Sequence, residues 1–150
     1  MSHEAHKQQA QPLTINCAVL TISDTRDVST DKAGRLITEA LLQDGHRILS
    51  YRIVKDEAET IKSSIKQLLD TDELQVVITS GGTGVSKRDV AIETVLPFLD
   101  RELTGFGELF RWLSYQEIGS PSMLTRATAG IAQGRIIFCL PGSPNAVQLA

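Results

Sequence analysis

The chain has 150 residues, of which 41% are hydrophobic and 22% charged, which is typical of one globular domain and excludes a disordered chain. Its net charge is −3, from 15 Lys and Arg against 18 Asp and Glu, and this acidic balance argues against a protein that binds nucleic acid. No apolar run approaches the roughly 20 residues of a membrane helix, so we expect no membrane partner.

The first 12 residues are polar and lack the apolar segment of a secretory signal, so we expect a disordered tail there. Residues 13–150 contain no linker, repeat or low-complexity tract, which predicts a single domain. The only two cysteines, Cys17 and Cys139, each lie inside an apolar run and are predicted to be buried thiols rather than a disulfide. A reduced, cytoplasmic protein is the expectation that follows.

Four apolar segments are predicted to be strands: Ile15–Ile22, Ile48–Val54, Gln75–Thr79 and Arg135–Leu140. Most are nearly continuous runs rather than alternations of apolar and polar residues. Such runs favour strands that are buried on both faces, as in a parallel sheet.

Helical patterns alternate with these strands, at Asp31–Asp44, Glu57–Thr71 and Val90–Leu96. Two further helices are predicted at Gly107–Glu117 and Ser122–Ala132, as an insertion before the last strand. The alternation predicts an α/β fold, a three-layer sandwich with a largely parallel sheet.

Small, polar and acidic residues follow every predicted strand. They are Ser23-Asp24-Thr25, Lys55-Asp56-Glu57, Ser80-Gly81-Gly82-Thr83-Gly84 and Pro141-Gly142-Ser143-Pro144. In an open parallel sheet all these loops leave the same edge, outside the carboxyl ends of the strands, where such folds bind ligands. The sequence therefore predicts a ligand site at this edge.

The segment Ser80–Gly84 has three glycines in four positions and is followed by Lys87 and Arg88. Glycine lets the backbone adopt positive φ and approach a ligand closely, and consecutive N–H groups can bind an anion. A phosphate site is favoured here, with a tight turn and a solvated basic pair as the alternative. The spacing is neither that of a Walker loop nor that of a dinucleotide fingerprint.

Three carboxylates, Asp24, Asp56 and Asp89, follow strands or their loops. Mg²⁺ prefers a few carboxylates together with water and substrate phosphates, so the set favours a magnesium site beside the phosphate loop. Each aspartate alone could instead cap a helix, and Asp89 lies where an N-cap belongs. Mg²⁺ beside phosphate indicates phosphoryl or nucleotidyl transfer.

Other segments leave alternatives open. Gly105–Arg111 is either a bend with Phe106 in the core or a loop that presents Glu108 or Arg111 to a ligand. Trp112 is expected in the core or in a subunit contact. Arg126 offers another cation, with a solvated helix face as the usual alternative. The turn at Pro141–Pro144 is expected to open a helix, with Ser143 as N-cap and Pro144 at the first helical position.

Taken in order, these motifs resemble the MoaB/MogA family of molybdenum cofactor biosynthesis, over nearly everything from Ile15 to the end. The matching segments are Ile22-Ser23-Asp24, Ser80–Gly84 with Arg88-Asp89, Gly105-Phe106-Gly107-Glu108 and Pro141–Pro144. The stretch Phe110–Gly119 resembles the MoaB branch. Family members continue past Pro144 through a complete helix, so we expect the final helix, six residues long at Ala150, to be incomplete.

The resemblance implies the molybdopterin-binding fold and Mg²⁺- and ATP-dependent adenylylation of molybdopterin, which releases pyrophosphate. The product would pass to a downstream molybdate-inserting enzyme, and the chain would form a homotrimer or homohexamer. A non-catalytic molybdopterin-binding or carrier protein of the same fold is the alternative. The resemblance implies catalytic and Mg²⁺-holding roles for Asp56 and Asp89. It implies ligand-binding roles for Ser23, Asp24, Ser80, Gly81, Gly82, Thr83, Gly84, Arg88, Gly107, Glu108, Pro141, Gly142, Ser143 and Pro144.

Overall fold

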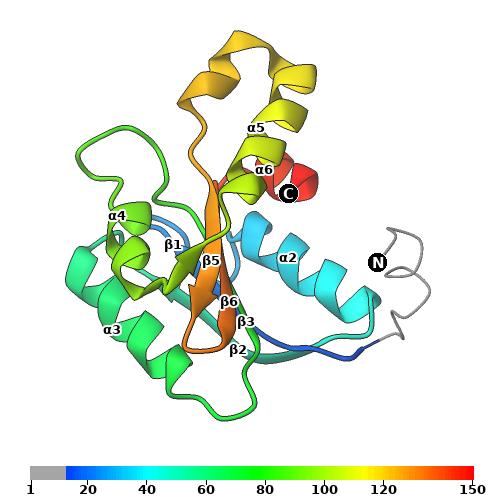
Figure 1. Cartoon of the computed structure of the whole chain (residues 1–150), viewed down its shortest axis with the longest axis vertical. Coiled ribbons are helices and arrows are strands. Elements are labelled where there is room, and N and C mark those ends of the chain that lie inside the picture. Colours follow the sequence, from blue (N-terminus) through cyan, green and yellow to red (C-terminus); the bar gives the residue numbers. More distant parts are fainter. Residues whose placement is uncertain (1–12) are drawn as a thin grey trace.

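A computed structural model of the protein describes residues 13–150; the tail expected at residues 1–12 lies outside this range. The centre of the fold is a sheet of six strands in the order β2-β1-β3-β6-β5-β4 (Figure 1). The strands are β1 (Asn16–Ile22), β2 (Arg47–Val54), β3 (Val76–Ser80), β4 (Arg101–Glu102), β5 (Thr128–Ala132) and β6 (Arg135–Leu140).

The strands β2, β1, β3 and β6 run parallel, whereas β5 and β4 are antiparallel additions at one edge. In the middle of the sheet, Leu20 of β1 lies between Arg52 of β2 and Thr79 of β3. The predicted largely parallel sheet is therefore confirmed. Its parallel strands all deliver their carboxyl ends to the same edge.

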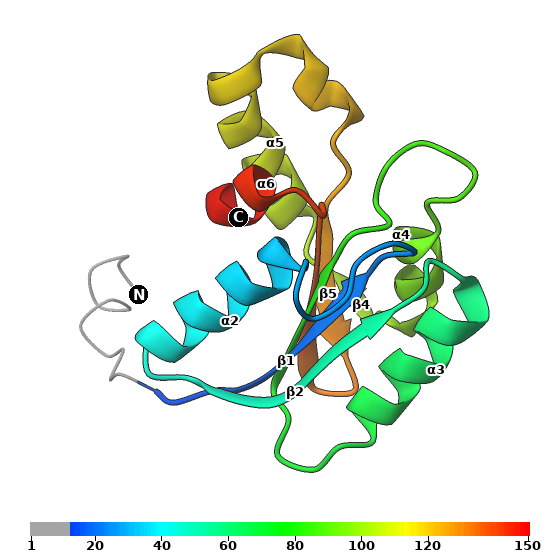
Figure 2. The ribbon, with the colours of Figure 1, turned by 180° about the vertical axis from the view of Figure 1, so that it is seen from behind.

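Helices cover both faces of the sheet, which gives the predicted three layers (Figure 2). On one face lie α2 and α6, and on the other α3 and α4, while α5 and the 3₁₀ turn η2 project beyond the carboxyl edge. The helical elements are α2 (Lys32–Gln43), α3 (Ala58–Leu69), α4 (Ala91–Val95), η1 (Leu96–Phe98), α5 (Thr104–Ile118), η2 (Ser120–Leu124) and α6 (Pro144–Leu149).

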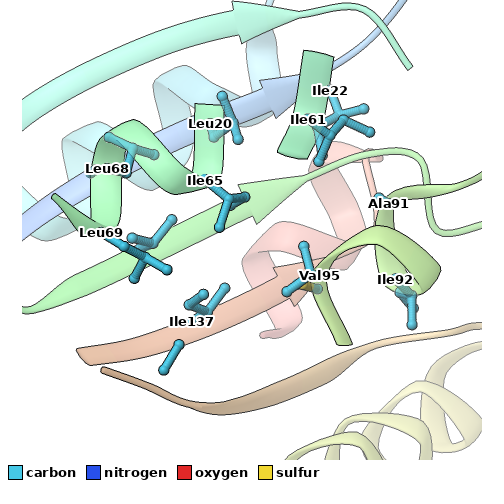
Figure 3. Packing of buried hydrophobic residues seen from close by; sticks show 14 of the residues in the cluster. Leu20, Ile22, Ile61, Ile65, Leu68, Leu69, Ala91, Ile92, Val95 and Ile137 are labelled. Atoms are coloured by element: carbon cyan, nitrogen blue, oxygen red, sulfur yellow. The ribbon is translucent and has the colours of Figure 1, made fainter. Parts of the chain in front are cut away.

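The main core lies between the sheet and the layer formed by α3 and α4 (Figure 3). Ile61, Ile65 and Leu68 recur on one face of α3 and are at most 1% exposed, as the period of 3.6 residues predicts. They pack with Leu20 of β1 and Ile137 of β6. A smaller cluster on the other face joins α2 and α6 to the sheet.

One predicted helix is wrong. The segment predicted as helical at Ser122–Ala132 is the end of η2 followed by the strand β5. A two-residue turn, Gln133-Gly134, with φ of 51° and 75°, folds β5 back onto β6 as an antiparallel hairpin. Positive φ at both turn positions is the signature of the tight hairpin turn, and this local signal outweighs the apolar spacing of the segment.

The cysteines are as predicted, since Cys17 and Cys139 are buried and free. The segment Gly105–Arg111, expected as a bend or a ligand loop, lies instead within α5. Phe106 is half-buried there and packs edge-on against Phe138, with ring centroids 5.1 Å apart, so its side chain does join the core side of the helix. Trp112 is 59% exposed on α5 and does not belong to the core. Within residues 13–150, no helix combines the length and the apolar character needed to cross a membrane.

Candidate functional site

A cavity of about 420 Å³ opens at the carboxyl edge, where β1, β3 and β6 end. Its walls come from the loops after these three strands and from the segment that joins η2 to β5. The lining residues are Ile22, Ser23, Thr25, Arg26, Gly81, Gly82, Thr83, Gly84, Asp89, Leu124, Thr125, Arg126, Pro141 and Gly142. The predicted convergence of distant loops at this edge is therefore present.

The glycine loop is held in a shape that other residues cannot adopt. Gly81 has a φ of 101°, and a Cβ atom there would lie 2.2 Å from the carbonyl oxygen of Ile22. Its N–H donates to the carbonyl oxygen of Leu140 at 3.0 Å, which fixes the start of the loop between β1 and β6. Gly82 also has a positive φ, of 66°.

The loop presents free backbone donors to the cavity. Within residues 13–150, the N–H groups of Gly82, Thr83 and Gly84 have no hydrogen-bond acceptor. Thr83 is only 5% exposed. Gly82 is half-buried and Gly84 is exposed, so Thr83 is the buried residue of the three. Consecutive N–H groups of this kind at a cavity wall can bind the oxygen atoms of an anion.

Arg126 holds this loop from the opposite wall. Its Nε donates to the carbonyl oxygens of Thr83 at 2.9 Å and Gly84 at 3.1 Å, and its Nη2 donates to Gly84 at 2.8 Å. The guanidinium also pairs with Glu93 of α4, and this contact lowers the pKa of the Glu93 carboxyl. The expectation of a solvated helix face was wrong for Arg126, because the helix on which it rested is absent.

Arg88, by contrast, does not face the cavity. Its guanidinium binds the carboxylate of Asp24 and approaches Glu57 at 3.9 Å. The Arg88 contact holds the pKa of Asp24 below its ordinary value. Lys87 is exposed and is also absent from the cavity wall. The cations at the cavity are Arg126, which the sequence offered as a further cation, and Arg26, which the sequence pattern did not single out.

Asp56 lies beneath the loop and is 8% exposed. Its carboxylate accepts one long hydrogen bond, of 3.4 Å, from the N–H of Val90, and a Cβ on Gly82 would lie 2.9 Å from its Oδ1. Burial raises the pKa of Asp56, and the neighbouring charges of Asp89 and Asp24 add to this effect. The side chain is thus a buried acid with few partners, directly behind the glycine loop.

Asp89 lies on the cavity wall. Its Oδ2 accepts from the N–H of Ser86 at 3.0 Å and from the Ser86 hydroxyl at 2.7 Å. The same oxygen lies 2.6 Å from where a Cβ on Gly84 would be. The N-cap of α4 is Val90, which makes no side-chain cap bond, so Asp89 closes the preceding turn rather than capping the helix.

Whether these residues fit a Mg²⁺ ion follows from the donor set. Within the described part of the chain, no three Asp, Glu, His or Cys side chains are grouped closely enough to hold a metal by themselves. Mg²⁺ needs only one or two carboxylates when phosphate oxygens and water complete the shell. Asp89 lies on the cavity wall beside Gly84, and Asp56 lies behind the loop beside Gly82. These two carboxylates are the number that Mg²⁺ requires when phosphate and water supply the other ligands.

The remaining predicted residues divide into two groups. Ser23 lines the cavity and accepts from the N–H of Arg26 at 3.2 Å, and Ser80 donates to the carbonyl oxygen of Pro141 at 3.5 Å. Pro141 and Gly142 also form part of the wall.

The second group lies away from the cavity. Ser143 caps α6 by accepting from the N–H of Ala146, and Pro144 is the first residue of that helix. Gly107 and Glu108 do not line the cavity either. A Cβ on Gly107 would lie 2.6 Å from the carbonyl oxygen of Ala127, so this glycine permits close packing of α5. Glu108 is exposed.

The fold and the cavity together define an α/β protein with a cavity at the carboxyl edge of a mostly parallel sheet. A family described as probable molybdopterin binding domain matches residues 18–150. The curated molybdenum cofactor biosynthesis protein B of Bacillus cereus is 48% identical over 151 aligned positions, which cover 100% of this chain and 89% of the relative. The chain belongs to the molybdenum cofactor biosynthesis protein B (MoaB) family.

Two crystal structures support the same fold. One, titled molybdenum cofactor biosynthesis protein B, is 48% identical, with a TM-score of 0.90 and coverage of 93% of this chain and 88% of the other. The second is the tungsten cofactor synthesizing protein MoaB of Pyrococcus furiosus, which is 40% identical with a TM-score of 0.78. It covers 93% of this chain and 89% of its own.

Proposed function

We propose that this protein adenylylates molybdopterin, with Mg²⁺-ATP as the second substrate and pyrophosphate as the second product. The observation that carries the proposal is the meeting, at one cavity, of the glycine loop with the carboxylate of Asp89, while the buried carboxylate of Asp56 lies behind the loop against Gly82. Membership of a family that works in molybdenum cofactor biosynthesis supports molybdopterin as the acceptor.

In this reaction an oxygen of the molybdopterin phosphate attacks the α-phosphorus of ATP. A new P–O bond forms, the bond to the β-phosphate oxygen breaks, and pyrophosphate leaves with the electron pair. The free N–H groups of Gly82, Thr83 and Gly84 bind phosphate oxygens. Asp89 orients the phosphates from the cavity wall, and Asp56 keeps a negative charge behind the loop.

Asp56 and Asp89 would hold the Mg²⁺ ion. When bound, this ion neutralises phosphate charge and stabilises the charge that develops on the leaving pyrophosphate. A burial-raised pKa on Asp56 supports this role, since a carboxylate that is costly to ionise gains most from a cation.

The test is molybdopterin-dependent release of pyrophosphate from Mg²⁺-ATP. We expect release by the unaltered protein and a fall of at least about 100-fold in Asp56→Asn and in Asp89→Asn, as for removal of a group that stabilises transition-state charge. Asp72→Asn is the matched control, because Asp72 is exposed before the amino end of β3, at the opposite edge of the sheet. Absence of release by the folded protein would contradict the proposal.

A second candidate is a non-catalytic molybdopterin carrier. The observation that favours it is the pairing of Asp24 with Arg88. Of the three aspartates predicted to hold a metal, only Asp56 and Asp89 then remain for one. A carrier would bind molybdopterin with similar affinity in the presence and absence of Mg²⁺-ATP and would release no pyrophosphate. The same assay, combined with equilibrium binding of molybdopterin, separates the two candidates.

The proposal extends to the setting of the protein. Family resemblance favours a cytoplasmic homotrimer or homohexamer that passes its product to a molybdate-inserting enzyme. Exposed apolar side chains on α5 and η2 support self-association; they are Leu109, Trp112, Tyr115, Ile118, Met123 and Leu124. Light scattering after size exclusion measures the mass directly. A monomer at micromolar concentration would contradict this part of the proposal.

A further inference from the structure

Among the described residues, Arg26 differs from Arg88 and Arg126 because no salt bridge joins its guanidinium to a carboxylate. Within residues 13–150, ion pairs at the carboxyl edge join Arg88 to Asp24 and Glu57, and Arg126 to Glu93. Arg26 lines the cavity and uses one donor, Nη1, which lies 2.8 Å from the carbonyl oxygen of Gly142. A guanidinium carries five N–H donors, so most of the capacity of Arg26 is left for a ligand.

Local structure fixes where this guanidinium lies. The hydroxyl oxygen of Ser23 accepts the N–H groups of Thr25 at 3.3 Å and Arg26 at 3.2 Å, which sets the course of the chain after β1. The bond to Gly142 then ties the side chain to the turn that follows β6. Arg26 is half-buried, so its charge is held at the cavity wall rather than extended into solvent.

The charge balance of the cavity shows what Arg26 can contribute. Of the described residues that form the wall, the ionisable ones are Arg26, Asp89 and Arg126, and the charge of Arg126 is already matched by Glu93. Asp89 repels an anionic ligand, and uncharged amides alone offset this repulsion weakly. A guanidinium binds phosphate oxygens through two parallel, charge-assisted hydrogen bonds, which are about twice as strong as neutral ones.

We propose that Arg26 binds a phosphate group of the substrate in this cavity, as the cationic side chain of the wall that contacts the ligand. The proposal rests on the proposed function for the identity of the ligand, because molybdopterin carries a phosphate monoester and ATP a triphosphate. Arg126 differs from Arg26 in being a positioning residue, which holds the loop carbonyl groups of Thr83 and Gly84. Arg88 does not contact the ligand in this proposal, because its guanidinium is paired with Asp24 and does not line the cavity.

Equilibrium binding tests the proposal without any turnover. Dissociation constants are measured for molybdopterin alone and for Mg²⁺-ATP alone, with the unaltered protein, Arg26→Gln and Arg26→Lys. We expect Arg26→Gln to weaken binding of the contacted ligand by about 10- to 100-fold, the usual effect of losing a charge-assisted pair. Arg26→Lys keeps the charge without the planar fork and is expected to recover part of this loss.

The matched control is Arg47→Gln, which removes the same charge from an exposed position at the amino end of β2. Weaker binding of molybdopterin only assigns Arg26 to the pterin phosphate, and weaker binding of Mg²⁺-ATP only assigns it to the nucleotide. Binding of both ligands within about twofold of the unaltered protein, in a variant with unchanged thermal stability, would overturn the proposal. An equal loss in Arg47→Gln would also overturn it, since net charge would then explain the effect.

The result is independent of catalysis. If the protein binds molybdopterin through Arg26 but releases no pyrophosphate, the proposed adenylylation fails while the role of Arg26 stands. If pyrophosphate is released at the same rate and with the same KM in Arg26→Gln, the role of Arg26 fails while the adenylylation stands.

Discussion

Arg88 donates to both carboxylate oxygens of Asp24, with Nε 2.8 Å from Oδ2 and Nη2 3.0 Å from Oδ1, across 64 residues of sequence. Asp24 Oδ1 also accepts the N–H of Asp56 at 3.1 Å. Three loops that follow three different strands are therefore joined through one carboxylate. This joint lies beside the cavity. It holds the segment that follows the glycine loop, because Arg88 belongs to that segment.

The first prediction concerns this joint. Arg88→Gln should increase amide hydrogen exchange across residues 84–89, because the segment loses its connection to Asp24. Thermal stability should change little, since the side chains of Arg88 and Asp24 are 59% and 34% exposed and solvent screens the pair. Lys87→Gln, which removes a neighbouring exposed charge, should leave exchange unchanged. Equal exchange in both variants would contradict the prediction.

The pH dependence of the joint follows from the lowered pKa of Asp24. A lowered pKa means that the folded protein favours the ionised form, so the stabilisation is present above the ordinary Asp range and is lost as pH falls through the lowered value. The pair should stay formed at neutral and mildly acidic pH. Carboxyl carbon shifts of Asp24 in an NMR titration check this, and a midpoint at or above the ordinary value would contradict it.

The second prediction concerns Asp56. Its raised pKa means that ionised Asp56 destabilises the folded state at neutral pH. Asp56→Asn keeps an acceptor for the N–H of Val90 and removes the charge, so the melting temperature at neutral pH should rise by about 1–4 °C. The gain should shrink as pH falls through the raised pKa, where Asp56 becomes protonated. Activity should fall at the same time; a variant that loses stability at neutral pH would contradict this account.

The third prediction separates steric fit from backbone conformation in the glycine loop. Gly81→Ala would place a Cβ 2.2 Å from the carbonyl oxygen of Ile22, whereas Gly134→Ala meets nothing within 4 Å. Both residues have positive φ, of 101° and 75°, so Gly134→Ala measures the conformational cost alone, about 1 kcal/mol. Gly81→Ala should cost at least about 2 kcal/mol more in the free energy of unfolding. Urea denaturation of both variants gives the difference, and similar values would contradict the close packing.

The fourth prediction concerns Arg126 and Glu93. Arg126→Gln should loosen residues 81–84 and lower kcat by about 10-fold or more, because mispositioned groups lose catalytic alignment. Glu93→Gln should have a smaller effect, since Arg126 keeps its bonds to Thr83 and Gly84. A positioning role predicts a change mainly in kcat with faster amide exchange in the loop. A change confined to KM would instead assign Arg126 to ligand contact.

The fifth prediction concerns the hydrogen bonds around Asp31, the N-cap residue of α2. Asp31, fully buried, accepts from the hydroxyl groups of Thr21 and Tyr51, each at 2.6 Å. Burial and the Asp31 contact raise the pKa of Tyr51 from 10.0 to about 12. The stabilisation by the neutral phenol is therefore complete below about pH 10 and is lost as pH approaches 12. The stability difference between the protein and Tyr51→Phe, measured by urea denaturation, should be constant near neutral pH and shrink only above about pH 10. A difference that already shrinks near neutral pH would contradict the raised pKa.

Much of the fold was predictable because its signals are local or periodic. The near-continuous apolar runs predicted β1 and β6, and the period of 3.6 residues predicted α3. The hairpin formed by β5 and β6 was not predicted, because the small residues that make up most of β5 have weak strand propensity. Gly134 beside Gln133 carried the turn signal that would have found it.

The sequence predicted which loops form the candidate site, but not which cationic side chains line it. Glycines and aspartates after strands mark the cavity edge, because chain direction alone brings those loops together. The partner of a long, flexible side chain depends on three-dimensional distance. Adjacency in sequence therefore favoured Lys87 and Arg88, whereas the cations on the cavity wall are Arg26 and Arg126. Gly107 was singled out by its motif, yet in the structure it permits close packing against Ala127.

The most direct test of the central claim is the identity of the product. Incubation of the protein with molybdopterin, Mg²⁺ and ATP labelled at the α-phosphate should transfer the label to molybdopterin, with adenylyl-molybdopterin identified by mass spectrometry. Asp89→Asn should form at most about one hundredth as much, for loss of a group that orients the reacting phosphates. Bound but unmodified molybdopterin, with all label remaining in ATP, would contradict adenylylation and leave a molybdopterin-binding protein.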